Sequence, residues 1–445
     1  MKKALLSLVI LGTTLPAITQ NIPSRLDALV RAYVNAAGFE GAVLVAAKGG
    51  VIFEKGYGYK NKTTKAFIDT NTIFQIGSIT KQFTSAIILQ LLEENRLSLQ
   101  DSLSKYIPDY PGGSLITIEQ LLTHTAGVYS YTNDAAFVEH GMTNPISRDS
   151  MIARFEYKPL GFIPGKKYSY SNSGYFLLGY IIEKITGQTY FQVVRQRIFE
   201  PLHMDHSGFD FTDLNIPDKA IGYISSENTV PAAIVDSSVS FSAGAIYTTV
   251  GDLYKWDRAL LAGSILSPAL QQKAYTPHLA RYGYGWIIGL IDGKKVVEHG
   301  GGILGFVSNI LRIPEDEICI VMLSNEGSYE YLSKMTMDIY GVLSGKDVRL
   351  PKAKVAVTLD TALLREYVGQ YQISANSSIT ISLKDGHLWG QAAGQGKTEL
   401  FAAKKDFFFP RVVDFDIEFV RGADGKIKKF ILHQNGQDIP AMRLE

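Results

Sequence analysis

The fold and the chemistry both start from one stretch, Phe74-Gln75-Ile76-Gly77-Ser78-Ile79-Thr80-Lys81. A short apolar segment here passes into an amphipathic pattern that predicts a helix over 79–95. Because Ser78 and Lys81 are three residues apart, the lysine amine can lie beside the serine hydroxyl on one helical face. The N-terminus of a helix also offers free N–H groups and a positive dipole end, which suit an oxyanion. The stretch therefore indicates a serine nucleophile assisted by a lysine.

Taken alone, this Ser-x-x-Lys spacing is a weak signal. Ser78 could simply cap the helix while Lys81 is a solvated charge. The same spacing recurs at Ser102 and Lys105, in a polar, proline-bounded stretch that favours a surface turn. The order of three motifs is more specific. Ser78 and Lys81 come first, Tyr170-Ser171-Asn172 follows in a turn before a helix, and His299-Gly300-Gly301 stands between two expected strands.

Strand patterns occur at both ends of the first 345 residues, with helical patterns between them. A helix over 22–37 precedes two strands over 43–47 and 51–57, joined by a Lys-Gly-Gly hairpin signal. Further strands are expected over 285–290, 295–298, 306–313 and 318–323, before a last helix over 329–343. The predicted fold class is α/β (α+β): an antiparallel sheet built from both ends and flanked by helices, with a separate helical lobe. A site is expected in the cleft between the sheet and the lobe.

Both ends of the chain differ from this central unit. Residues 1–19 have a Lys2-Lys3 start, a short apolar run and a cleavage-like end near Thr19, which predicts a signal peptide and export to the periplasm or beyond. The apolar run is too short for a stable membrane anchor. We expect a hydrolase domain over 20–345 and a linker over 346–354. Short alternating strands over 355–445 predict a small all-β barrel domain.

Composition excludes several classes of protein. The 445 residues carry 44 Lys and Arg against 43 Asp and Glu, a net charge of +1, which argues against nucleic acid or anionic membrane as the partner. The single cysteine, Cys319, rules out an internal disulfide framework and is expected to be inert core. His203 and His206 lack a third convincing ligand, so no metal is expected. No cofactor fingerprint is present, the expected partner is a small-molecule or peptide substrate, and the oligomeric state stays open.

With these motifs in this order, residues 25–343 resemble the penicillin-recognising serine hydrolases. That group includes class C β-lactamases, D-alanyl-D-alanine carboxypeptidases, D-aminopeptidases and serine esterases. Supporting stretches are Leu121-Leu122-Thr123-His124-Thr125-Ala126-Gly127, Ser242-Ala243-Gly244-Ala245 and Tyr282-Gly283-Tyr284-Gly285-Trp286. The resemblance implies a β-lactamase/transpeptidase-like fold, and the C-terminal unit is similar to the lipocalin-like barrels of some members. His124 is expected to be a hydrogen-bonded structural histidine.

The resemblance also implies roles for individual residues. Ser78 matches the nucleophile, Lys81 the lysine one turn later, and Tyr170 the tyrosine that exchanges protons with the serine and the leaving group. Either Lys81 or Tyr170 could be the base in acylation. Asn172 would contact the substrate amide and help to hold Lys81. The N–H groups of Ser78 and Gly302 would form the oxyanion hole.

The third motif departs from the β-lactamase pattern. Those enzymes commonly present a lysine, a hydroxyl residue and a glycine on this strand, whereas this chain has His299, Gly300 and Gly301. A titratable imidazole replaces the cation and the hydroxyl is missing, so efficient β-lactam hydrolysis is not expected. We expect His299, Gly301 and Gly302 to bind substrate, with the glycines allowing its backbone to approach closely. Tyr282 is expected to line the cleft.

The sequence therefore predicts an exported serine hydrolase that works through an acyl-enzyme. Its expected substrate is a peptide or amide containing a D-amino acid, derived from the cell wall in the simplest case. The alternatives are a carboxylesterase of the same fold and a non-catalytic penicillin-binding sensor.

Overall fold

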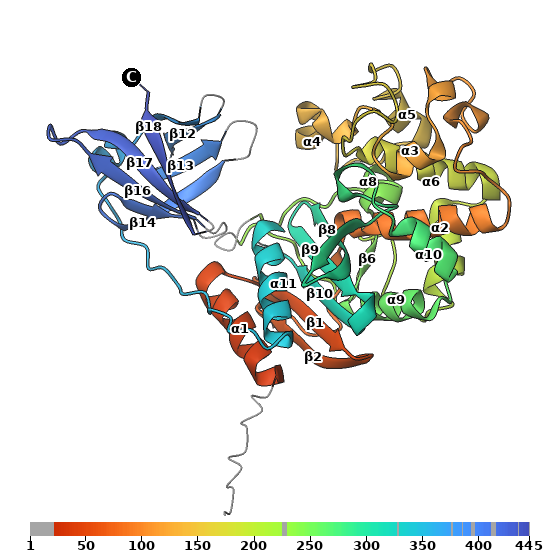
Figure 1. Cartoon of the computed structure of the whole chain (residues 1–445), viewed down its shortest axis with the longest axis horizontal. Coiled ribbons are helices and arrows are strands. Elements are labelled where there is room, and N and C mark those ends of the chain that lie inside the picture. The colour runs from red at the N-terminus through yellow and green to blue at the C-terminus, as the bar shows by residue number, and fades with distance from the viewer. Residues whose placement is uncertain are drawn as a thin grey trace, which may run out of the picture.

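Six antiparallel strands form the central sheet in the order β2-β1-β10-β9-β8-β7 (Figure 1). The computed structural model describes residues 22–224, 229–326, 329–374, 377–384, 386–392, 397–410, 415–434 and 436–444. The strands of the central sheet are β1 (Gly41–Ala47), β2 (Gly50–Tyr57), β7 (Ile287–Ile291), β8 (Lys294–Ile303), β9 (Phe306–Ile313) and β10 (Ile318–Ser324). β1 pairs with β10, so the sheet joins both ends of the unit as the sequence predicted.

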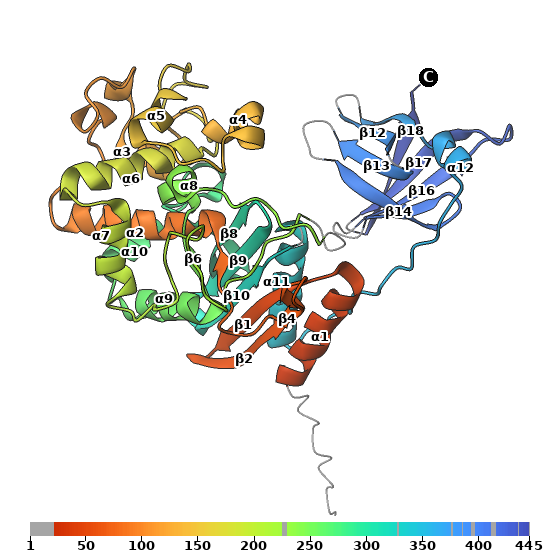
Figure 2. The same ribbon diagram turned by 180° about the vertical axis from the view of Figure 1, so that it is seen from behind.

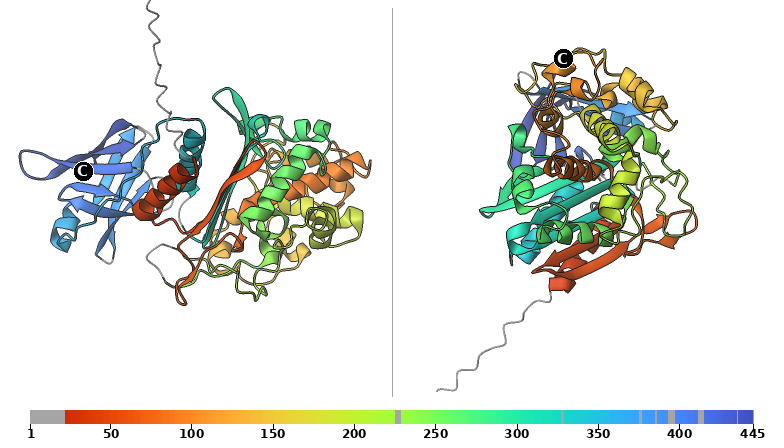
Figure 3. Two further views of the ribbon diagram at one scale, coloured as in Figure 1. Left: turned by 90° about the horizontal axis from the view of Figure 1, so that it is seen from below. Right: turned by 90° about the vertical axis from the view of Figure 1, so that its right-hand side faces the viewer.

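Both faces of the sheet are covered, which explains why β1 and β10 are apolar almost throughout (Figure 3). Helices α1 (Ile22–Ala37) and α11 (Tyr329–Leu343) pack on one face, where Val43 and Val45 share a core with Leu26 and Leu29. The intervening residues of β1, such as Leu44, point into the core of the helical lobe on the other face. This alternation follows from the two-residue period of a strand.

The helical lobe is built around α2 (Thr80–Glu93), which is buried along most of its length. A 3-10 turn, Gly77–Ile79, precedes it and carries Ser78. The other helices of the lobe are α3 (Ile118–Leu122), α4 (Ala135–His140), α5 (Arg148–Ala153), α6 (Asn172–Thr186), α7 (Tyr190–Val194), α8 (Ser237–Gly244), α9 (Val250–Ala262) and α10 (Pro268–Ala274). Short strand pairs β3 (Tyr59–Asn61) with β4 (Ala66–Phe67) and β5 (Phe74–Gln75) with β6 (Tyr247–Thr248) complete it. The β5–β6 pair fixes the backbone immediately before Ser78.

The C-terminal unit is a closed antiparallel barrel with its own aromatic core (Figure 2). Tyr371, Phe408, Phe419 and Phe430 are all buried inside it. A short helix, α12 (Thr361–Glu366), precedes the strands. The strands are β11 (Gly369–Ser374), β12 (Ser377–Lys384), β13 (His387–Ala392), β14 (Thr398–Lys404), β15 (Phe407–Phe409), β16 (Phe415–Arg421), β17 (Ile427–Gln434) and β18 (Gln437–Arg443). Closure removes the exposed edge strands that invite aggregation.

The predicted fold class is confirmed, but one strand was predicted too short. The sequence placed His299-Gly300-Gly301 between two strands, whereas β8 continues through them to Ile303. His299, Gly300 and Gly301 pair with Ile310, Asn309 and Ser308 of β9. Glycines weaken a strand pattern in the sequence, yet their backbone groups can still form the ladder.

The predicted signal peptide, residues 1–19, lies outside the described residues. None of the helices in the described ranges reaches the length and apolarity that a bilayer crossing requires.

Candidate active site

The turn before α2 presents Ser78 at the junction of the sheet and the helical lobe. Gly77 has φ +51°, a left-handed conformation that favours glycine. A Cβ at Gly77 would lie 2.9 Å from the backbone nitrogen of Gly302, so only glycine lets β8 approach this turn so closely. Ser78 is half-buried, while Gly77 and Ile79 on either side are buried. The serine is therefore held on rigid backbone with its side chain near the surface.

Lys81 lies beneath Ser78 and is fully buried. Its Nζ lies 2.9 Å from Ser78 Oγ, 2.8 Å from Asn172 Oδ1 and 2.8 Å from the carbonyl oxygen of Ala243. Burial lowers the pKa of Lys81 well below its ordinary value, because desolvation disfavours the ammonium. A neutral amine at this position could donate to Asn172 and Ala243 and accept from Ser78.

Tyr170 also contacts the hydroxyl of Ser78. Its Oη donates to Ser78 Oγ at 2.8 Å, and its ring lies under the Lys81 amine at 4.8 Å from the centroid. Burial raises the pKa of Tyr170 well above its ordinary value, and the hydrogen bond to Ser78 only partly opposes this effect. Ser171 caps α6 by accepting from the N–H of Gly174, which fixes the turn that carries Tyr170.

Asn172 is the first residue of α6 and is held by two hydroxyl groups. Its backbone N–H donates to Ser130 Oγ at 3.0 Å, and its Nδ2 donates to Thr132 Oγ1 at 3.1 Å. With Nδ2 on Thr132, Oδ1 is directed at Lys81. The structure thus brings Ser78, Lys81, Tyr170 and Asn172 into one hydrogen-bonded group.

Strand β8 lies against the turn that carries Ser78, and its glycines differ in what they face. A Cβ at Gly301 would lie 1.9 Å from the carbonyl oxygen of Ile76, so this glycine admits the chain's own backbone. Gly301 is buried, and the prediction that it lets a substrate backbone approach is wrong at this position. Gly302 is exposed, and its Cβ position has open space around it. Ser308 Oγ donates to Ile76 O and fixes the same contact.

His299 and Tyr282 do not face an open cleft as predicted. They are 3% and 1% exposed, and Tyr282 Oη lies 2.9 Å from His299 Nε2. His299 Nδ1 donates to Gly300 O at 2.6 Å, so Nε2 accepts from the tyrosine and both ring nitrogens are occupied. Burial, with a smaller effect of the nearby Lys81 amine, lowers the pKa of His299 to about 3. The imidazole is therefore a neutral internal group rather than a cation for a substrate carboxylate.

The chain matches two models of known protein families. The family model described as Beta-lactamase matches residues 26–338. The chain belongs to the beta-lactamase family. A second family model, described as a domain of unknown function, matches residues 353–443, which is the barrel.

Two of the following relatives of this beta-lactamase family member cover more than 90% of the chain, and the third covers about three quarters of it. A penicillin-binding protein of Bacillus subtilis is 27% identical over 437 residues, covering 91% of this chain and 95% of the relative. The octameric penicillin-binding protein homologue from Pyrococcus abyssi is 27% identical with a TM-score of 0.67, covering 94% of this chain and 99% of that chain. A D-stereospecific amidohydrolase from Streptomyces sp. is 27% identical with a TM-score of 0.59, covering 74% of this chain and 99% of that chain.

Three residues at the site were not predicted from the sequence of this family member. Ser130 and Thr132 hold Asn172, and the carbonyl of Ala243 accepts from Lys81. The Ser-Ala-Gly-Ala stretch had marked the position of Ala243, but every residue carries a carbonyl, so no side-chain pattern indicates this contact. For Ser130 and Thr132, the sequence offered one indication: two hydroxyl residues stand only two positions apart.

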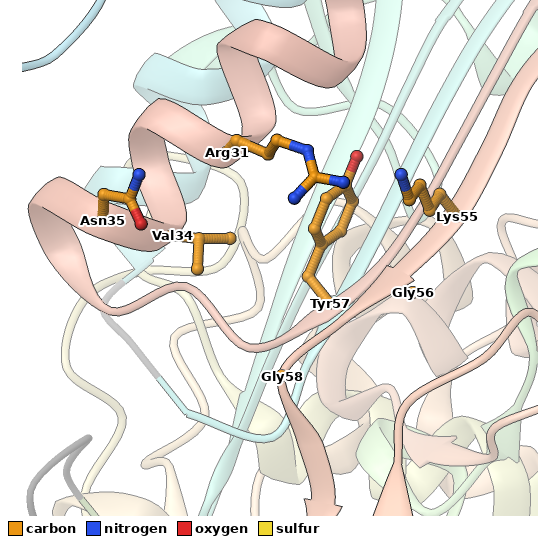
Figure 4. A pocket seen from close by; sticks show the side chains of 7 residues that line it. All are labelled: Arg31, Val34, Asn35, Lys55, Gly56, Tyr57 and Gly58. Carbon is orange, nitrogen blue, oxygen red and sulfur yellow. The ribbon is translucent and has the colours of Figure 1, made fainter.

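Two further features of the structure lie outside this group of residues. A hollow of about 280 Å³ is lined in part by Arg31 of α1 and Lys55 of β2. Figure 4 shows these side chains. Both cations bind Asp27, at 3.0 and 2.9 Å. His203 and His206, considered as metal ligands in the sequence, belong to no metal-binding cluster within the described ranges.

Proposed function

We propose that this protein is a serine hydrolase that works through an acyl-enzyme on Ser78. One observation carries the proposal: Ser78 Oγ has the amine of Lys81 at 2.9 Å and the phenol of Tyr170 at 2.8 Å. A serine hydroxyl becomes a useful nucleophile when a neighbour takes its proton, and both candidate neighbours are in hydrogen-bond contact with it.

The directions of the two pKa shifts favour Lys81 as the base in acylation. Burial favours a neutral amine at Lys81 and a neutral phenol at Tyr170, so the lysine has a lone pair to accept the serine proton. Ser78 Oγ forms a bond to the substrate carbonyl carbon while its proton passes to Lys81 Nζ. The resulting ammonium is held by Asn172 Oδ1 and Ala243 O.

Tyr170 completes the proton transfers. As the carbon–nitrogen or carbon–oxygen bond breaks, Tyr170 gives its proton to the leaving group and recovers one from Lys81. Water then attacks the acyl-enzyme by the reverse sequence of proton transfers, which releases the acid and restores Ser78. The backbone N–H groups of Ser78 and Gly302 are the proposed oxyanion donors, supported by the exposure of Gly302 and its close approach to Gly77.

The proposed substrate is a peptide or amide that contains a D-amino acid. The likeness to a D-stereospecific amidohydrolase supports this class. The burial of His299 also supports it, because β8 then lacks the free cation and the hydroxyl with which β-lactamases hold a substrate carboxylate. Short acyl esters are the second candidate substrate. They carry no carboxylate, so they do not need a cation or a hydroxyl on β8 in order to bind. The signal-peptide pattern supports export as the setting of this activity.

A substrate panel with wild type and Ser78→Ala tests the proposal. D-Alanyl peptides, D-aminoacyl amides, β-lactams and p-nitrophenyl esters should give turnover by the wild type in at least one class and none by the variant. No side-chain cap hydrogen bond begins α2, and Ser78 is only half-buried, so the variant should stay folded. Equal turnover by both proteins would overturn the assignment. A stable penicillin adduct without turnover would instead favour a non-catalytic sensor.

A further inference from the structure

His124 forms hydrogen bonds to the backbone on both sides of Tyr170. Its backbone carbonyl accepts from the N–H of Ser169 at 2.9 Å, and its Nδ1 accepts from the N–H of Ser171 at 3.1 Å. His124 itself has φ +58°, a left-handed conformation that is uncommon for a residue other than glycine. This conformation allows one residue to bind the backbone before and after the catalytic tyrosine.

The ring of His124 also lies against the ring of Tyr170. The two ring centroids are 4.2 Å apart, and the rings of Tyr282 and Tyr175 lie at 4.6 and 5.0 Å. The side chain is buried, with 2% of its surface exposed. It therefore packs directly against the ring of Tyr170.

The protonation of His124 follows from these contacts. Because Nδ1 accepts a hydrogen bond from a backbone N–H, the ring proton must be on Nε2. Burial lowers the pKa of His124 well below its ordinary value, with smaller contributions from Lys81 and His299. The ring is thus neutral, and its acceptor remains available to Ser171.

A purely structural role would not require a histidine here. Nε2 is buried and has no hydrogen-bond partner among the described residues, which is unfavourable for a polar group. An apolar side chain of similar size would fill the same space without this penalty. The feature that only the histidine supplies is the Nδ1 acceptor for Ser171.

We propose that His124 is a positioning residue that holds the phenol of Tyr170 on Ser78 through its hydrogen bond to Ser171 and its ring contact. The inference rests on the proposed function, because it assigns His124 a purpose in acyl transfer. His124 does not touch the reacting atoms. Its effect is exerted through the direction of Tyr170 Oη.

Three substitutions separate the acceptor from the packing. In His124→Asn the amide oxygen can occupy the position of Nδ1, whereas in His124→Gln the amide is carried to the position of Nε2. His124→Leu removes both polar atoms. Each variant is compared with wild type and Ser78→Ala for hydrolysis of p-nitrophenyl acetate and for the Tyr170 Oη–Ser78 Oγ distance in crystal structures. Asn and Gln are both polar, so this pair remains informative if the leucine variant does not fold.

We expect His124→Asn to keep kcat within about 3-fold and to keep the contact between Tyr170 and Ser78. His124→Gln should lower kcat by about 100-fold with KM nearly unchanged, because a misdirected proton donor slows the chemical steps. Gln and Asn variants with equal kcat and an equal Tyr170 position would overturn the inference. If wild type does not hydrolyse the ester, the proposed function loses support while the crystal distances still decide the role of His124.

Discussion

At the scale of single residues, the site depends on Lys81, which is buried among neutral groups. Within the part of the chain that the structure describes, its hydrogen-bond partners are all neutral oxygen atoms: the Ser78 hydroxyl, the Asn172 side chain and the Ala243 carbonyl. Neutral partners compensate an ammonium less well than a carboxylate would, so desolvation dominates and the amine form is favoured. This arrangement lowers stability in order to supply a base, as is common for perturbed groups at active sites.

Lys81→Met tests this account through the pH dependence of stability. Between the lowered pKa of Lys81 and its ordinary 10.5, the unfolded chain binds a proton at this residue that the folded chain does not. The unfolding free energy of wild type should therefore gain about 1.4 kcal/mol per pH unit relative to Lys81→Met in this window. Urea unfolding at pH 7, 8 and 9 measures the slope, and turnover should be lost in the variant.

Lys105→Met is the matched control, because Lys105 belongs to the second Ser-x-x-Lys match but is 54% exposed and pairs with Asp101. It should retain wild-type turnover. A flat difference between wild type and Lys81→Met across this pH range would mean that Lys81 stays protonated in the folded protein. The rate should also fall as pH decreases through the lowered pKa, since protonation removes the base.

Gly301 is a second residue at the site that must be glycine, because the backbone of Ile76 leaves no room for a side chain. Gly301→Ala would place a Cβ 1.9 Å from the carbonyl oxygen of Ile76 and 2.5 Å from Ser308 Oγ. β8 must then move away from the turn that carries Ser78, which should destabilise the fold by about 1–3 kcal/mol and lower kcat/KM by about 100-fold. Thermal unfolding and steady-state kinetics measure both effects. Gly289→Ala on β7 is the control, because a Cβ there meets nothing within 4 Å, and both measurements should stay near wild type.

At the scale of elements, the site exists where α2, α6 and β8 meet. Internal polar contacts hold these elements together: Thr84 of α2 donates to the carbonyl of Ser242, and Ser242 Oγ donates to the carbonyl of Tyr175 in α6. Ser308 of β9, the strand that pairs with β8, donates to Ile76. α9 is attached to β9 by a buried ion pair in which Arg312 Nε donates to Asp257 Oδ1 at 2.6 Å. These contacts fix the relative positions of the lobe and the sheet.

Asp257→Ala should unfold the protein at lower denaturant concentration than any surface substitution. It leaves the Arg312 guanidinium buried at 1% side-chain exposure without its carboxylate, at a cost of about 3–5 kcal/mol. Replacing both partners, as in Asp257→Leu with Arg312→Met, should recover most of this loss because no charge is then left unpaired. Lys346→Ala, which breaks an exposed pair with Asp292, should cost less than about 1 kcal/mol. A double variant no more stable than Asp257→Ala would contradict this account.

The elements themselves were largely predictable from the sequence, whereas their contacts were not. Helix α1 has the predicted bounds, and β9 begins and ends where its apolar pattern does. The extension of β8 through His299 was missed because glycines carry no side-chain pattern. The inward turn of His299 was missed because its partner, Tyr282, comes from another element. Periodicity reports which face of an element is buried, but it cannot report which buried residues meet.

At the scale of the whole molecule, two units with separate cores share one chain. The proposed catalytic unit, residues 22–343, has a core on each face of its sheet. The buried core residues of the barrel lie between Leu364 and Ala441. The residues between α11 and α12 include the exposed Val355, 79% of whose surface is accessible. A unit with its own core and a closed sheet satisfies the physical conditions for independent folding.

Truncation of the chain after Lys346 should therefore leave the fold of the catalytic unit intact. Because the contacts of Ser78, Lys81 and Tyr170 all lie within that unit, p-nitrophenyl ester turnover should stay within about 3-fold of the full chain. Residues 353–445 expressed alone should show a cooperative thermal transition from the barrel core. Calorimetry of the full chain would then show two transitions that match those of the separate units.

If the truncated unit keeps its thermal transition and loses only the turnover of larger peptide substrates, the barrel contributes to substrate binding. Loss of the transition itself would mean that the barrel stabilises the catalytic fold, contrary to the independence of the two cores.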